Sequence, residues 1–550
     1  MASVDRPDRP QRARFAVGAV VGALVVTGVA LGVDAASPDP TALGPPRFVD
    51  ETTTSGVEHS YDGPFEFFVG GGVAVLDCND DGRSDLFLAG GTSPSHLYVN
   101  RSEPGGTITL ESVAIPAGLD GVTGAYPLRL DADDRVDLVV LRVGENVVLR
   151  GMGECRFERA NESLGIDGGA EWTAAFSAAW DEGDDLPTLA FGNYLDLEGS
   201  GDRFGECEPH RLVRPGPDGG YGPPEELGPG WCTLSLLFSD WSRSGRQDLR
   251  ATNDRHYYID GQEQLWQVFG VDGVRAFGED DGWEELRIWG MGIASQDLDA
   301  DGIPEVFLTS QGDNKLERLV DDADGPTYRN ISLDAGVTAH RPFVGGDVFP
   351  STAWHAEFDD VNNDGWMDLF IAKGNVSAQE GFAIDDPNNL LLGTPEGVFR
   401  EAATEAGTAD MASTRGGALV DLNRDGLLDL VTVAREAPAK VWRNIGSGSG
   451  LEPEPMGHFV SIRLRQPPPN TGAVGAWIEV DAGPVSVVRE VVVGGGHAGG
   501  DATWVHVGIG DAERARVRVT WPDGDVGPWQ DIVVDAYTEL GRGEDPLVIP

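Results

Sequence analysis

Short apolar runs separated by acidic turns recur along much of the chain. Residues 72–76 and 86–88 flank one such turn, and residues 418–420 and 430–433 flank another. Short runs that are rich in β-branched side chains and bounded by glycine are typical of β-strands. The pattern therefore predicts an all-β fold built from strand–turn–strand units.

The turns follow the template D-x-[DN]-x-D-G-x-x-[DE]. Side-chain oxygens stand at positions 1, 3, 5 and 9, glycine stands at position 6, and the residue at position 7 can offer its backbone carbonyl. The four full copies are Asp77, Asn79, Asp81, Arg83 and Asp85; Asp297, Asp299, Asp301, Ile303 and Glu305; Asp360, Asn362, Asp364, Trp366 and Asp368; and Asp421, Asn423, Asp425, Leu427 and Asp429. A weaker copy contains Asp240, Ser242, Ser244, Arg246 and Asp248.

Oxygen ligands converging on one point are the donor set of a hard cation, and Ca²⁺ fits them best. We expect Ca²⁺ in the four full copies and weak binding at Asp240, where serine hydroxyls replace two carboxylates. Two eroded copies begin at Asp131 and Asp181. Because their altered spacing no longer directs the oxygens to one point, we expect them to hold no ion.

An EF-hand begins with the same letters, but it requires an acid at position 12 and flanking helices. Position 12 is Leu88, Ala251, Leu308, Ile371 or Thr432 in this chain, and the flanks have strand patterns. The acid at position 9 takes the place of the distant glutamate, so the EF-hand is rejected.

Successive loops begin about 50–60 residues apart, which indicates a repeat architecture. Residues 157–166, 328–337 and 399–408 resemble one another and close their repeats, whereas the last repeat lacks such a segment. A similar segment, residues 48–57, precedes the first repeat. We therefore predict that it supplies the last strand of the seventh repeat and closes a ring over residues 47–445.

Charge and cysteine content limit the partners and the chemistry that are compatible with the sequence. The net charge is −51, with 40 basic and 91 acidic residues, which argues against nucleic acid as a partner. Bound cations would account for part of this acidity. The four cysteines form no C-x-x-C pair, so zinc and thioredoxin chemistry have no support, and an even count in an exported chain suggests two disulfides.

The N-terminus predicts a membrane anchor. Residues 1–14 contain four arginines, and residues 15–33 carry no charge over a length that can span a bilayer. The arginine asymmetry places residues 1–14 in the cytoplasm and the remainder outside, as a single-pass protein of the cell membrane. The alternative is a signal peptide that is cleaved near Ala36, which would make the protein secreted. Residues 34–46 read as a linker.

The C-terminal part reads as a separate module. Residues 446–457 form a Gly- and Pro-containing linker, residues 458–541 show five strand-like runs, and residues 542–550 form a tail. The runs predict a small β-sandwich or barrel. Within this module, Gly494-x-Gly496-x-x-Gly499 matches a dinucleotide fingerprint by letters, but no helical pattern follows it, so no dinucleotide site is predicted.

The loop, the strand after it and the phenylalanine that closes each repeat resemble the FG-GAP/VCBS repeats of integrin-type β-propellers. Residues 191–194, 253–258, 263–266, 290–292 and 415–417 are further similar to the cartilage acidic protein family, including its bacterial members. Asn470, Gly472, His497, His506 and residues 521–524 resemble the ASPIC/UnbV module of that family. The resemblance implies a seven-bladed propeller followed by this module.

The resemblance also supports a Cys207–Cys232 disulfide, in an insertion rich in Gly and Pro that offers little core. A bridge there would restrict the unfolded ensemble. Cys78–Cys155 then follows by elimination.

Two functional hypotheses follow. The first is a calcium-binding, non-enzymatic module for adhesion or binding at the cell surface, with an extracellular protein or glycan as partner. The alternative is a cell-surface enzyme acting on polysaccharide, whose paired carboxylates could hide among the 91 acids. No catalytic residue is assigned, because His256 near Asp254 and His355 near Glu357 are neighbours that an acidic chain produces by chance.

Overall fold

The computed structural model describes residues 42–196, 206–217, 219–254, 261–270, 273–320 and 325–550. Internal contacts divide the chain into Met1–Pro38 and Asp39–Pro550, and the first unit lies outside the described residues. The predicted membrane segment, residues 15–33, is part of that unit. Among the residues that are described, no helix is long and apolar enough to cross a membrane.

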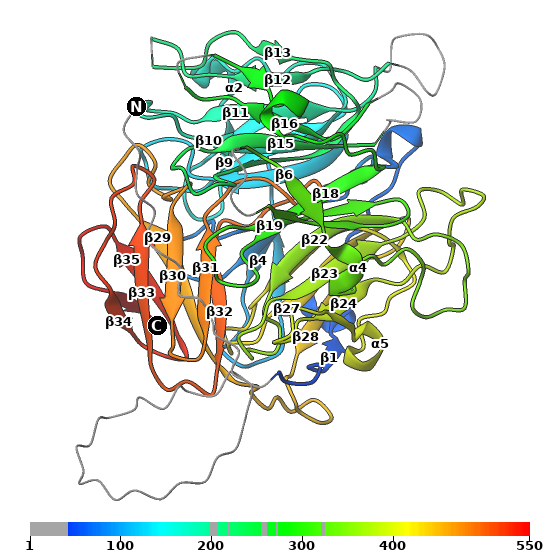
Figure 1. The fold of residues 1–550 in the computed structure, drawn as a ribbon, viewed down its shortest axis with the longest axis vertical. Helices are drawn as coiled ribbons and strands as arrows, with labels where there is room; N and C mark the ends of the chain where they lie inside the picture. Colours follow the sequence, from blue (N-terminus) through cyan, green and yellow to red (C-terminus); the bar gives the residue numbers. More distant parts are fainter. Residues whose placement is uncertain (1–41, 197–205, 218, 255–260, 271–272, 321–324) are drawn as a thin grey trace, which may run out of the picture. The chain divides into compact units, whose positions relative to one another are not determined.

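Within the described residues, seven four-stranded antiparallel sheets account for residues 48–444 (Figure 1). Their first strands are β2 (Val73–Leu76), β6 (Val122–Leu128), β10 (Thr173–Ala179), β14 (Thr233–Ser239), β18 (Gly290–Gln296), β22 (Ala353–Asp359) and β26 (Ser413–Val420). Their second strands are β3 (Asp85–Leu88), β7 (Asp137–Arg142), β11 (Thr188–Asn193), β15 (Asp248–Asn253), β19 (Glu305–Ser310), β23 (Asp368–Lys373) and β27 (Asp429–Arg435).

The outer halves of the sheets are shorter. The third strands are β4 (His96–Asn100), β8 (Val147–Gly151), β12 (His210–Val213), β16 (Gln264–Gln267), β20 (Lys315–Leu319), β24 (Asn389–Leu392) and β28 (Lys440–Asn444). The fourth strands are β5 (Leu110–Val113), β9 (Phe157–Arg159), β13 (Glu225–Leu227), β17 (Arg275–Ala276), β21 (Tyr328–Asn330), β25 (Arg400–Glu401) and β1 (Phe48–Asp50).

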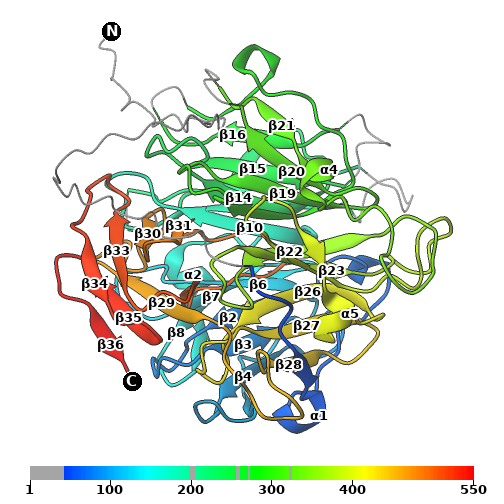
Figure 2. The same cartoon turned by 60° about the horizontal axis from the view of Figure 1, so that its bottom comes forward.

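The first strands form a closed circuit. Each contacts the first strand of the next sheet, from β2 through β26, and β26 contacts β2 again. Nearly all first-strand residues are buried, because both of their faces are covered by neighbouring sheets. Large apolar side chains such as Phe176, Phe238 and Phe307 fill the spaces between sheets. Figure 2 labels several of these inner strands around the centre.

The predicted ring closure is confirmed. β1 pairs with β28 through Phe48 opposite Asn444 and Asp50 opposite Trp442, and the blue β1 lies beside the yellow β28 in Figure 1. A buried ion pair stabilises the same strand pairing: Arg443 Nε lies 2.8 Å from Glu51 Oε1. The two ends of the ring thus share one sheet.

The closing segments are shorter strands than the pattern suggested. Each of the four similar segments is a brief fourth strand followed by a one-turn helix that ends at a left-handed glycine. The helices are α1 (Thr52–Ser55), α2 (Asn161–Leu164), α4 (Ser332–Ala335) and α5 (Ala403–Ala406), ending at Gly56, Gly165, Gly336 and Gly407. Two short 3₁₀ turns, η1 (Phe65–Phe67) and η2 (Glu279–Asp281), complete the helical content of the described residues.

The C-terminal module contains two four-stranded sheets among the described residues, with strand orders β32-β29-β35-β36 and β31-β30-β33-β34. Its strands are β29 (His458–Arg465), β30 (Trp477–Asp481), β31 (Ser486–Glu490), β32 (Val505–Gly510), β33 (Ala515–Thr520), β34 (Gln530–Ile532), β35 (Ala536–Gly541) and β36 (Leu547–Ile549). β36 corrects the prediction that residues 542–550 are only a tail, because it pairs with β35.

One apolar cluster joins the module to the ring. Phe307 and Phe358 of the ring belong to the same buried set as Val460, Ile478 and Val507 of the module. The module is therefore packed onto the ring.

A glycine-rich segment of the module, residues 493–501, runs through the channel enclosed by the first strands. We call it the channel strap. It forms β-bridges with β2, β6, β10, β14 and β18. The supporting backbone bonds include Gly495 N to Leu236 O at 2.7 Å, Gly496 N to Ile293 O at 2.6 Å and Val75 N to Gly500 O at 2.9 Å.

Glycine is required where the strap approaches the ring. A Cβ on Gly499 would lie 2.0 Å from the backbone oxygen of Val73, and a Cβ on Gly72 would lie 1.8 Å from that of Ala498. Neither oxygen belongs to a side chain that can rotate away. The close approach therefore excludes any larger residue unless the backbones separate.

We predict that Gly499→Ala lowers the free energy of unfolding by about 1–3 kcal/mol, the usual cost of overpacking, because the strap must leave β2. Denaturant unfolding measures the change. Gly278→Ala is the control, since its Cβ would meet nothing within 4 Å. Equal losses in the two variants would contradict the tight approach.

Candidate functional site: calcium loops and the central channel

The five best-matched loops share one hydrogen-bond plan. Each connects a first to a second strand, and its first aspartate accepts the N–H groups of positions 5 and 6 at 2.7–3.2 Å. The glycine at position 6 has φ between +80° and +90°, a conformation that L side chains rarely adopt. The sequence template is therefore a geometric requirement of the turn.

The acid at position 9 ties the loop to the rest of its sheet. Asp368 accepts the N–H groups of Val361 and Gly393, both at 2.9 Å, and thereby links the loop to the end of the third strand. Asp85 and Asp429 make equivalent pairs of bonds. Asp137 keeps this arrangement in an eroded loop, so position 9 has a structural role in addition to any metal ligation.

In the loop at Asp297, three acids converge. Asp297, Asp299 and Glu305 each offer an oxygen, and these oxygens lie within 4.8 Å of one another. Burial raises the pKa of Glu305 to about 7. Arg318 already neutralises part of this cluster, with Nε 2.6 Å from Glu305 Oε1 and Nη2 3.3 Å from Asp299 Oδ2. Calcium at this loop would therefore share its ligands with an arginine.

The loop at Asp360 contains three buried acids. Asp360, Asp364 and Asp368 are at most 1% exposed, and no lysine or arginine of the described residues pairs with them. Burial raises the pKa values of Asp360 and Asp368 well above the ordinary range, and their mutual proximity raises them further. Buried carboxylates in this arrangement repel one another unless protons or a cation neutralise them.

The loop at Asp421 is similar but touches the module. Burial, together with the charge of the neighbouring Asp425, raises the pKa of Asp421 to about 7. The hydroxyl of Tyr537, on β35, donates to Asp421 Oδ2. The loop at Asp77 also meets the module, since Arg463 Nη1 lies 3.2 Å from Asp77 Oδ2.

Two of the weaker loops hold arginine partners that the sequence pattern did not indicate. The Ser244 hydroxyl donates to Asp240, and Arg246 pairs with Asp248 at 3.2 Å. Asp131 pairs with Arg150 at 2.7 Å. In each of these two loops, an arginine side chain of the protein therefore neutralises one of the acids. Weak calcium binding at Asp240 and the absence of an ion at Asp131 stay predictions.

Both expected disulfides are present. Cys78 is bonded to Cys155 and Cys207 to Cys232, and the described residues contain no free cysteine. Cys78 follows Asp77 directly, so the first bridge connects the first acidic loop to the second repeat.

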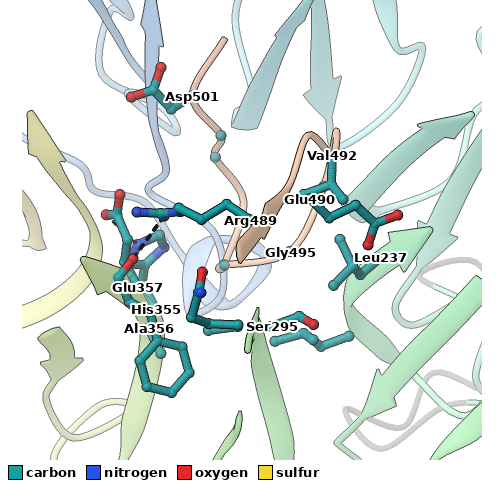
Figure 3. A pocket seen from close by; sticks show the side chains of 18 of the residues that line it. Leu237, Ser295, His355, Ala356, Glu357, Arg489, Glu490, Val492, Gly495 and Asp501 are labelled. Atoms are coloured by element: carbon teal, nitrogen blue, oxygen red, sulfur yellow. Dashed lines mark hydrogen bonds and ion pairs between the residues drawn. The ribbon is translucent and has the colours of Figure 1, made fainter. Parts of the chain in front are cut away.

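The channel places residues of the ring beside residues of the strap (Figure 3). His355 and Glu357 lie on β22, with Nε2 and Oε2 3.6 Å apart. The strap adds His497, whose backbone N–H donates to His355 Nδ1 at 3.1 Å. His256 lies outside the described residues, and Asp254 accepts the hydroxyl proton of Tyr194. The glycine run at 494–500 was the only sequence signal for the strap.

Comparisons with known proteins agree with the architecture. Residues 360–432 match the FG-GAP-like repeat family and residues 466–546 match the ASPIC and UnbV family. The chain therefore contains an FG-GAP-like repeat and an ASPIC/UnbV domain. No curated protein matches the sequence.

Several solved structures are similar to parts of this chain at low sequence identity. The BBS1N protein in complex with ARL6DN is 10% identical, with a TM-score of 0.41, over 74% of this chain and 99% of that one. An Agrocybe aegerita lectin specific for non-reducing terminal N-acetylglucosamine is 15% identical, with a TM-score of 0.38, over 67% and 93%. The extracellular domain of a putative hybrid two-component system from B. thetaiotaomicron is 8% identical, with a TM-score of 0.38, over 91% and 59%.

His497 makes stability depend on pH. Burial lowers the pKa of this imidazole to about 3, and its Nε2 accepts the N–H of Gly70 at 3.0 Å. Below pH 6.5 the unfolded chain takes up a proton that the folded chain excludes, so stability falls on acidification by roughly 1.4 kcal/mol per pH unit from this group. In His497→Gln, we expect the slope of stability against pH between pH 6.5 and 4, measured by urea unfolding, to be smaller by about this amount. A slope equal to that of the wild type would contradict the assignment.

Proposed function

We propose that this chain is a calcium-stabilised, seven-bladed β-propeller of the integrin type, exported and held at the cell surface, that binds an extracellular protein without catalysis. The resemblance to the cartilage acidic protein family, the two disulfides and the acidic loops support this assignment. The observation that carries calcium binding is the buried Asp360, Asp364 and Asp368 cluster without a basic partner among the described residues.

Calcium would occupy the loops through the side-chain oxygens at positions 1, 3, 5 and 9 and the carbonyl at position 7. Its charge would offset the repulsion between the carboxylates and fix the turn between two strands. The role is structural: a filled loop holds first and second strands in register. A site of this class binds at about 10⁻⁴ to 10⁻³ M in extracellular proteins.

We predict that Asp364→Ala reduces the stabilisation by calcium. At free calcium about tenfold above the dissociation constant, each filled site adds roughly 1.4 kcal/mol, which the variant should lose. Thermal unfolding in calcium and in chelator measures the difference. Asp133→Ala, in an eroded loop, is the matched control and should respond as the wild type does. If calcium stabilises all three proteins equally, or none of them, Asp364 is not a ligand.

An exposed apolar patch favours a protein partner. It consists of Phe343, Val348, Phe349, Ile384 and Met411, each between 43% and 66% exposed. These residues come from three segments that connect strands, and the segments contact one another. The N–H of Ile384 donates to Asp347, and a Cβ on Gly345 would lie 3.1 Å from Met411 Cε. Contiguous apolar surface of this kind marks protein interaction sites.

The patch lies at the opposite end of the strands from the calcium loops. Its connections precede β22 and β26 and follow β23, whereas the calcium loops follow the first strands. The module contacts the calcium-loop end through Arg463, Tyr537 and Glu490. The patch is therefore left uncovered by the module.

We predict that Phe349→Asp combined with Ile384→Asp abolishes binding of the calcium-loaded protein to the surface of the producing cells. Flow cytometry with labelled protein measures binding. Val533→Asp, an exposed apolar position on the module, is the control and should bind normally. Binding that survives in the patch variant contradicts a role for the patch. Binding that is lost after glycosidase treatment of the cells, or release of soluble sugar by the protein, would indicate a glycan partner or an enzyme instead.

A further inference from the structure

The channel strap leaves a polar cavity beside it. The cavity has a volume of about 180 Å³ and is lined by β2, β14, β18, β22, β26 and the strap. An apolar cavity of about 150 Å³ holds benzene, so this space admits a ring-sized molecule. It lies inside the ring of first strands, away from the apolar patch.

One wall presents an unsatisfied donor. His355 is 6% exposed, and its Nδ1 accepts the backbone N–H of His497. Because a backbone N–H can only donate, the imidazole hydrogen resides on Nε2. That atom is buried and has no hydrogen-bond partner among the described residues. Glu357 Oε2, 3.6 Å away, is too distant for a good hydrogen bond.

The other walls present acceptors. Asp501 of the strap uses Oδ1 to accept the N–H and hydroxyl of Thr503, which leaves Oδ2 without a hydrogen bond in the described structure. The Asp501 side chain is exposed to solvent. Glu357 also lines the cavity, and its Oε2 accepts the N–H of Leu419 at 3.0 Å. Glu490 lines it as well, but both of its oxygens already accept hydrogen bonds, from Ser239, Asp240 and Gln247. Figure 3 shows Asp501, Glu357 and Glu490 around the same space.

Arg489, the one arginine among the residues that line the cavity, is already paired with other groups. Arg489 pairs with Asp359 at 3.0 Å and donates to the backbone oxygens of His506 and Phe358 at 3.1 Å. It therefore neutralises Asp359 rather than a carboxylate of the cavity. An anionic ligand would be repelled by Glu357 and Asp501 and is disfavoured.

The donor and the acceptors together select a ligand class. A simple cation would satisfy the carboxylates but would face the Nε2–H of His355. A hydroxyl group can donate to a carboxylate and accept from an imidazole. We propose that the cavity between His355, Glu357 and Asp501 binds a neutral polyhydroxylated molecule of monosaccharide size. This site is independent of the proposed protein-binding patch.

The test uses the full chain in calcium with D-xylose, D-glucose, D-galactose and D-mannose as probes, and choline as a cationic comparison. We expect saturable binding of at least one sugar, detected by saturation-transfer NMR and measured by calorimetry. Asp501→Asn should weaken it at least tenfold. Ser295→Leu, which fills the cavity from β18 while leaving every carboxylate in place, should do the same. Asp531→Asn, an exposed acid on β34, should bind as the wild type does.

Three results would overturn the proposal. The first is that none of the four sugars binds, so that the cavity holds only water. The second is that choline binds and the sugars do not. The third is that a sugar binds equally to the wild type and to Ser295→Leu. Since the leucine variant retains His355, Glu357 and Asp501, it decides the question even if Asp501→Asn fails to fold.

Discussion

The passage of the strap through the channel is the constraint on which the two parts of the molecule depend. Its backbone bonds to the first strands of five sheets, so the strap can leave only if several of these bonds break together. The glycines at Gly72 and Gly499 permit this approach on both sides. A module held in this way forms one body with the ring, although the sequence divides them with a flexible linker.

The same arrangement brings acidic loops and module into one electrostatic system. Arg463 reaches the first loop, the Tyr537 hydroxyl reaches the last, and Glu490 accepts the N–H of Asp240 in a third. A cation in these loops would therefore act on groups that also hold the module. Part of the acidity of the chain therefore lies where the ring meets the C-terminal module.

Local rules made much of this architecture predictable. The D-x-[DN]-x-D-G pattern identifies the turns because glycine alone tolerates their φ near +85°. The repeat-closing similarity identified β1, because β1 and its counterparts share one strand–helix–glycine unit. These features depend on residues that are close in sequence, and the sequence therefore records them.

The features that could not be predicted depend on residues far apart in the chain. Gly494–Gly500 match a nucleotide-binding pattern by letters, yet their glycines serve approach to strands hundreds of residues away. Arg318 beside Asp299 and β36 beside β35 likewise arise from packing. The channel chemistry follows the same rule: His355 becomes an orphan donor only because the strap supplies the His497 N–H to its other nitrogen. A fold of this kind does not define a function by itself. The chemistry of the channel belongs to the junction of the two parts, so a ligand bound there would contact both and stabilise their association.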